Sequence, residues 1–100
     1  MALKIFWNKR AINNFDNILF YLEQKFGLNT AKSFAKKVYK SIDHLSEFPE
    51  IGTIENDENQ IRGFVIVKQV TIFYKVFGEQ ITILSLFDNR QNPKGKIFKI

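Results

Sequence analysis

The sequence predicts an α+β domain of two layers, in which an antiparallel helical hairpin packs against a mostly antiparallel sheet. Apolar residues recur at helical spacing in two successive segments, the first followed by a glycine and the second by a proline. Three strand-like segments come next, at 61–67, 70–77 and 80–87, and a short apolar run precedes the helices. The expected element order is therefore β-α-α-β-β-β, and 100 residues are enough for one domain, 1–100.

The first part of the chain predicts a strand and then a helix. Ala2–Trp7 is an apolar run interrupted by Lys4, and Asn8 is a good N-cap for the helix that follows. Gly27 is suited to end this helix, because glycine adopts a positive φ without steric cost. The apolar stripe of the helix comprises Ala11, Ile12, Phe15, Ile18, Leu19, Leu22 and Phe26.

A second helix is expected to begin with Asn29 or Thr30 as its cap and to end at Pro49, which lacks a backbone donor. The connection is so short that the two helices run antiparallel. The apolar stripe comprises Ala31, Phe34, Ala35, Val38, Ile42 and Leu45. The other side carries four lysines and is either solvated or in contact with nucleic acid or a protein partner. These lysines are Lys32, Lys36, Lys37 and Lys40.

Residues 49–60 predict a loop that is the one negative region of a basic chain. Its acids are Glu50, Glu55, Asp57 and Glu58. The ligand spacing of an EF-hand is absent, so this loop is not expected to bind calcium. The next strand, 61–67, contains Gly63 as a candidate bulge.

The segment 70–93 forms the centre of the predicted sheet. Gly78-Glu79 suits a two-residue type II′ turn. Such a turn pairs Val76 with Ile81, Tyr74 with Ile83 and Phe73 with Leu84. Both faces of this hairpin are largely apolar, whereas two helices cover only one face of a sheet. The second face is therefore expected either to be covered by the C-terminal residues 94–100 or to bind a partner.

Composition and charge exclude several classes of protein. The absence of cysteine excludes disulfides, thiolate chemistry and cysteine zinc sites, and it fits a reducing cytoplasm. Neither a signal peptide nor an apolar run long enough to span a membrane is expected. The net charge of +5 and the pI of about 9.6 favour an acidic partner such as nucleic acid, or else reflect a lysine-rich surface.

The sequence contains no motif for nucleotide binding, for a nucleophile elbow or for a metal site, and no cofactor is expected. His44 is interpreted as a surface or packing residue. Two of the candidate residues also have a structural interpretation: Tyr74 as a packing residue of the sheet, and Arg62 as the partner of an acid in the preceding loop. The remaining candidates are cationic or aromatic side chains of the kind that bind phosphate, stack on bases or stabilise charge on phosphorus. They are Arg62, Lys68, Tyr74, Lys75, Arg90, Lys94, Lys96 and Phe98.

Several motifs, in this order along the chain, resemble the RelE/ParE superfamily of type II toxin–antitoxin toxins. They are Ala31-x-x-Phe34, Leu45-x-x-Phe48-Pro49-x-x-Gly52, Arg62, Ile72-Phe73-Tyr74-Lys75-Val76 and Phe87-Asp88-Asn89-Arg90-Gln91-Asn92-Pro93. The resemblance extends over essentially the whole chain. It implies the same β-α-α-β-β-β fold and a small cytoplasmic bacterial toxin of the plasmid-stabilisation type, which inhibits growth and is neutralised by a cognate antitoxin.

The resemblance implies one of two activities. RelE-like toxins cleave mRNA on the ribosome. ParE-like toxins poison DNA gyrase and have no nuclease site. In a nuclease, the resemblance implies that Arg62, Lys68 and Arg90 hold phosphate and that Tyr74 orients the scissile nucleotide. Thr71 stands where RelE-like enzymes carry a strand arginine, and Phe98 stands in place of a C-terminal tyrosine or histidine, so the comparison slightly favours gyrase.

Contacts with the antitoxin or the target are expected from a further set of residues near the end of the sheet. They are Lys75, Phe87, Asn89, Gln91, Lys94, Lys96 and Phe98. Operator DNA is expected to be bound only indirectly, through the antitoxin. The alternative is a non-toxic binding module of the same fold that acts only through an antitoxin–operator DNA complex.

Overall fold

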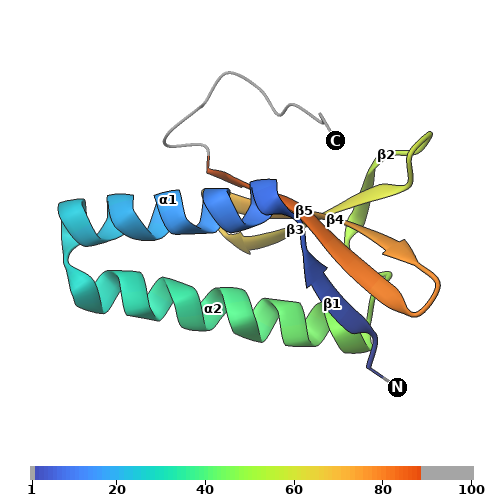
Figure 1. Cartoon of the computed structure of the whole chain (residues 1–100), viewed down its shortest axis with the longest axis horizontal. Coiled ribbons are helices and arrows are strands. Elements are labelled where there is room, and N and C mark those ends of the chain that lie inside the picture. The colour runs from blue at the N-terminus through green and yellow to red at the C-terminus, as the bar shows by residue number, and fades with distance from the viewer. Residues whose placement is uncertain (1, 89–100) are drawn as a thin grey trace.

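The computed structural model describes residues 2–88, which form two helices on one side of a five-stranded sheet (Figure 1). The elements are β1 Lys4–Trp7, α1 Lys9–Phe26, α2 Leu28–Glu47, β2 Thr53–Asn56, β3 Ile61–Val67, β4 Val70–Phe77 and β5 Gln80–Asp88. This confirms the predicted α+β class and the helical hairpin. One strand was not predicted: β2 lies inside the segment expected to be a loop, because it adds to the free edge of β3.

The helix ends are set largely by side chains visible in the sequence. The Asn8 side chain accepts a hydrogen bond of 2.8 Å from the Ala11 amide, as expected of an N-cap. Gly27, at φ 99°, ends α1 and is also the residue from which α2 begins. The predicted caps Asn29 and Thr30 are therefore wrong, because the chain re-enters the helix at Leu28 and both residues lie inside α2.

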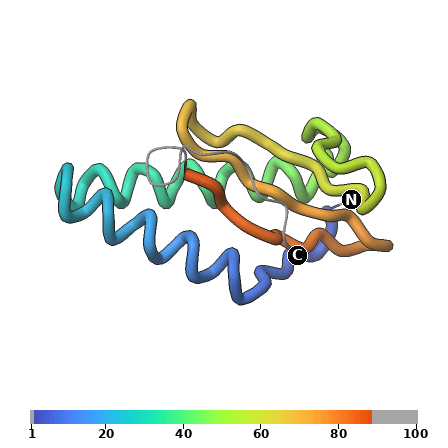
Figure 2. Tube along the Cα trace, turned by 90° about the horizontal axis from the view of Figure 1, so that it is seen from above, coloured from blue at the N-terminus to red at the C-terminus, as the bar shows by residue number. Residues whose placement is uncertain are grey.

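The strand order is β1-β5-β4-β3-β2, with β1 parallel to β5 and every other pair antiparallel. Figure 2 shows the hairpin of β4 and β5 between β3 and the N-terminal strand. The sheet is therefore organised around β4 and β5, as the sequence predicts.

The register of the central hairpin is confirmed in part. Val76 pairs with Ile81 and Tyr74 with Ile83, across a turn whose Gly78 has φ 61°. Phe73 pairs with Ser85, not with Leu84, because a bulge inserts one residue of β5 at this point. The predicted bulge at Gly63 is also wrong, since the irregularity of β3 lies between Val65 and Val67.

The helix-facing side of the sheet carries the main core. Its strand residues are Val70, Ile72, Tyr74, Ile81, Ile83 and Leu86, and they pack with the buried stripes of α1 and α2. The second face carries a smaller cluster of Ile61, Phe73 and Leu84, all buried. The centre of that face is thus not the open apolar surface considered above. The suggestion that residues 94–100 cover it lies outside the described residues.

Candidate functional site

The loop that leaves α2 is held by the hydroxyl of Tyr74. This ring is fully buried on the helix-facing side of β4. Its hydroxyl donates a hydrogen bond of 2.8 Å to the Pro49 carbonyl and accepts one of 3.0 Å from the Gly52 amide. Because both bonds lie inside the chain and the ring has no exposed surface, Tyr74 has no area available to orient a nucleotide in this structure.

Gly52 is required by this contact. A Cβ built on Gly52 would overlap the Tyr74 hydroxyl and would lie 2.8 and 2.9 Å from two ring carbons. Burial raises the pKa of Tyr74 above the ordinary value of 10.0, while the Gly52 amide and the nearby Arg62 oppose the shift. The phenol is therefore neutral at physiological pH and acts as both a donor and an acceptor.

Arg62 holds the same loop from the neighbouring strand. It pairs with Tyr74 across β3 and β4, and its Nη1 donates to the Gly52 carbonyl at 2.7 Å and to the Glu50 carbonyl at 3.1 Å. The sequence suggested as an alternative that Arg62 pairs with an acid of the preceding loop. Arg62 does bind that loop, but its acceptors are backbone carbonyls and not a carboxylate. We call the arrangement of Tyr74, Arg62 and residues 49–52 the loop latch.

Of the predicted phosphate-binding residues, the structure describes Arg62 and Lys68, and it does not bring these two together. Lys68 is exposed in the turn after β3, whereas Arg62 is the second residue of that strand. Six residues of extended chain separate them by ~20 Å. The Lys68 turn instead lies near the end of β5, since Val70 pairs with Asp88. Arg90, Asn89, Gln91, Lys94, Lys96 and Phe98 lie outside the described residues.

Two exposed phenylalanines and two lysines share the second face near the β4–β5 turn. Phe6 pairs with Thr82 and Lys75 also pairs with Thr82, so the three side chains form one row across β1, β5 and β4. The next row consists of Lys4, Gln80 and Phe77. Phe6 is 50% exposed and Phe77 78% exposed. We call Lys4, Phe6, Lys75 and Phe77 the turn-end patch.

Of the predicted contact residues, Lys75 belongs to this patch, while Phe87 is half-buried against the Ile61–Phe73–Leu84 cluster. Sequence reasoning missed Lys4, Phe6 and Phe77 as surface residues. The available signal was strand alternation, which places Phe77 on the same face as Lys75. The pairing of β1 with β5, which adds Lys4 and Phe6, is not visible in the sequence.

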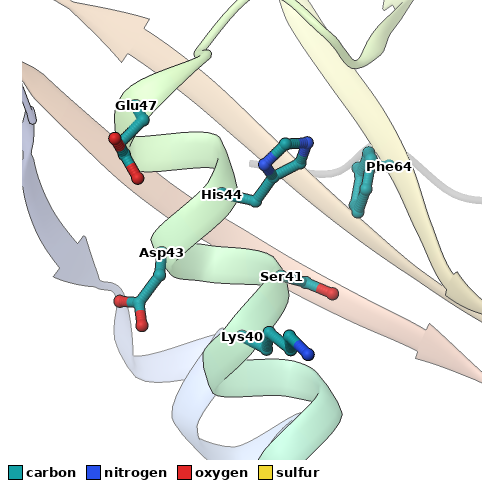
Figure 3. Close-up of a pocket in the computed structure, with 6 residues that line it drawn as sticks. All are labelled: Lys40, Ser41, Asp43, His44, Glu47 and Phe64. Atoms are coloured by element: carbon teal, nitrogen blue, oxygen red, sulfur yellow. The ribbon is translucent and has the colours of Figure 1, made fainter.

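A groove of about 420 Å³ lies between α2 and β3. Figure 3 shows His44 of α2 and Phe64 of β3 facing each other there, with ring centroids 6.4 Å apart. His44 also lies 5.2 Å from the Phe48 ring. It is exposed and packs against aromatic rings, as the sequence interpretation expected.

Acidic residues Asp43 and Glu47 line the same groove. Nevertheless, within residues 2–88 no group of three or more histidine, aspartate or glutamate side chains is arranged to hold a metal ion. Neither α1 nor α2 is both long and apolar enough to cross a membrane.

The comparisons with known proteins agree with this architecture. A sequence profile described as "ParE toxin of type II toxin-antitoxin system, parDE" matches residues 5–93. Toxin ParE1 of Caulobacter vibrioides is 26% identical over 92 residues, which cover 90% of this chain and 93% of that protein.

Solved structures share the fold. A chain of a chromosomal ParDE toxin–antitoxin system from P. aeruginosa superposes with a TM-score of 0.74 at 15% identity, covering 87% of this chain and 96% of that one. A mutant of the E. coli toxin RelE in the free state gives 0.60 at 13% identity, covering 93% and 90%. The family profile spans most of the sequence and the fold is shared with both structures, so the chain belongs to the ParE toxin family of type II toxin–antitoxin systems.

Proposed function

We propose that this chain is a growth-arresting toxin that poisons DNA gyrase without nuclease chemistry. The observation that carries the proposal is the loop latch: Arg62 and Tyr74, two of the four candidate nuclease residues, bind the protein's own backbone. The third candidate, Lys68, lies ~20 Å from Arg62 along the strand. A cation that already donates to two carbonyls is poorly placed to hold a scissile phosphate.

The position of Thr71 supports the same target. RelE-like toxins carry an arginine at about this point of the strand, according to the resemblance described above. Thr71 is buried and uncharged, so it cannot supply that positive charge. The similar protein from Caulobacter vibrioides is named Toxin ParE1, and the resemblance described above implies that ParE-like toxins poison gyrase.

The test has two parts. The chain alone is expressed from an inducible promoter in a bacterial host and growth is followed; the purified chain is then assayed for inhibition of gyrase supercoiling and for mRNA cleavage during cell-free translation. We expect growth arrest and inhibition of gyrase supercoiling, with no added mRNA cleavage in a cell-free translation reaction. Cleavage that requires ribosomes, with supercoiling unaffected, would refute the gyrase target. In that case Arg90→Ala should abolish toxicity while leaving antitoxin affinity nearly unchanged. Unaffected growth would favour the non-toxic binding module.

We further propose that a cognate antitoxin neutralises the toxin by covering the turn-end patch. Phe6 and Phe77 supply exposed apolar area next to two lysines, which suits an amphipathic segment with acidic side chains. The predicted contacts Phe87, Asn89, Gln91, Lys94, Lys96 and Phe98 remain part of this proposal. Sequence-specific reading of operator DNA is assigned to the antitoxin.

A further inference from the structure

Three lysines of α2 form a straight row on the surface. Lys32, Lys36 and Lys40 follow one another at intervals of four residues, and all three are exposed. Helical periodicity places them opposite the buried stripe that includes Phe34, Val38 and Ile42. Each step corresponds to ~6 Å along the helix axis. We call these three residues the lysine row.

The lysine row is unfavourable for the isolated helix. Like charges at positions i and i+4 repel, and both Lys32–Lys36 and Lys36–Lys40 are such pairs. The first turn of α2 contains no acidic residue that would favour the helix dipole. Asp43 is the one acid within four positions of any member of the row. Because Asp43 lies three positions after Lys40, the helix offsets charge only at that end of the row, and Lys32 and Lys36 have no acid within four positions on α2.

Charge is separated along the chain and not mixed. Residues 28–40 contain four lysines and no acid, whereas residues 50–58 contain four acids and no base. A surface selected only for solubility normally intersperses the two signs. The separation leaves the outer side of α2 as a concentrated positive surface, and an anionic partner would remove the repulsion within it.

A nucleic-acid backbone fits this surface better than an acidic protein does. Protein interfaces are depleted in lysine and depend on aromatic or arginine anchors. Near the row, α2 exposes the large side chains of Leu28, at 53%, and Tyr39, at 56%, and the Tyr39 ring already packs edge-on against Phe15 of α1. Regularly spaced lysines act as flexible point charges, which suits repeated phosphates contacted without regard to base sequence.

We propose that the lysine row binds the phosphate backbone of nucleic acid without sequence preference. The contact is separate from the turn-end patch and does not depend on whether gyrase or the ribosome is the target. In an antitoxin complex on DNA the row would add phosphate contacts made by the toxin itself. Operator DNA would then be bound by the toxin as well, and not only through the antitoxin as the resemblance implies. On a ribosome or a gyrase–DNA complex the row would hold the toxin near its target.

The experiment measures binding of the full chain to fluorescein-labelled 20-bp duplex DNA, and to duplex RNA of the same sequence, by fluorescence anisotropy across a salt series. The variant is K32Q/K36Q/K40Q. The matched control is K9Q/R10Q/K25Q, which removes three exposed basic residues outside the lysine row and the turn-end patch and gives the same net charge. Circular dichroism checks that both variants retain the helices of the parent chain.

For the lysine-row variant on DNA, we expect the plot of the logarithm of the association constant against the logarithm of the salt concentration to become less steep. The magnitude of its slope should decrease by about 2.7, because three phosphate contacts are lost. We expect affinity to fall at least tenfold, and the control to lose much less. A loss confined to one polymer would assign the row to DNA or to RNA. Equal losses in the two variants, or no change in slope, would overturn the proposal. The proposal would also be overturned if the lysine-row variant kept its affinity for nucleic acid but bound the antitoxin more weakly.

Discussion

Strand β4 carries three aromatic side chains, and two of them, Tyr74 and Phe77, lie in very different environments. Tyr74 is fully buried and its hydroxyl makes two hydrogen bonds, whereas Phe77 is 78% exposed at the end of the same strand. Their cationic neighbours differ in the same way, since Arg62 donates to backbone carbonyls and Lys75 lies on the turn-end patch. Residue type alone therefore does not distinguish a structural group from a binding group. The face of the sheet and the position along the strand both matter, since Phe73 lies on the same face as Phe77 and is buried.

The largest effect is expected where the loop latch is most crowded. Gly52→Ala should lower the free energy of unfolding by about 3 kcal/mol, because its Cβ overlaps the Tyr74 ring and hydroxyl. Urea denaturation measures the change. In the background of Tyr74→Phe, which removes the overlapping oxygen, Gly52→Ala should cost less than in the parent chain. A cost that is the same in both backgrounds would show that the latch is not the reason for the glycine.

Tyr74→Phe by itself should cost about 2 kcal/mol, since the buried Gly52 amide and the Pro49 carbonyl both lose their partner. The pKa of Tyr74 is raised in the folded state by burial, so its contribution is complete below pH 10 and is lost as pH rises toward the folded pKa. The parent chain should therefore lose its advantage over Tyr74→Phe above pH 10. Parallel stability curves for the two proteins at high pH would contradict this.

Replacing Phe77 tests the other end of β4. Phe77→Ala should weaken antitoxin binding about tenfold, or about 1.4 kcal/mol, with little change in stability because the ring is exposed. Calorimetric titration with the purified antitoxin gives the affinity. Phe20→Ala is the matched control, since Phe20 is 65% exposed on α1, away from the patch. Equal losses in the two variants would show that the turn-end patch has no special role.

The smallest effect is expected at the outer part of the latch. Arg62→Ala should lower the free energy of unfolding by about 1 kcal/mol, because two partly exposed hydrogen bonds to carbonyls are lost. Lys68→Ala, in the exposed turn at the other end of β3, should change it by less than about 0.5 kcal/mol. Growth arrest should survive Arg62→Ala. If Arg62→Ala abolished toxicity without changing stability, Arg62 would have a catalytic role.

Much of the fold could be predicted from local patterns. The helical stripes, the Asn8 cap, the end of α1 at Gly27 and the turn at Gly78 each depend on residues close together in the chain. The bulge in β5 and the strand β2 could not be predicted in this way. Both depend on how a strand meets a partner that is distant in sequence.

The candidate sites likewise combine features visible in the local sequence with features that depend on residues distant in the chain. The sequence by itself determined which side chains were available: a lysine-rich second helix, the Pro49 and Gly52 motif, and a hairpin apolar on both faces. Only the tertiary structure decided that Tyr74 and Arg62 hold the loop and that Phe6 joins Phe77 on one surface. The physical reason is that strand alternation fixes the relative faces of neighbouring residues, while the packing of the helices decides which of the two faces is buried.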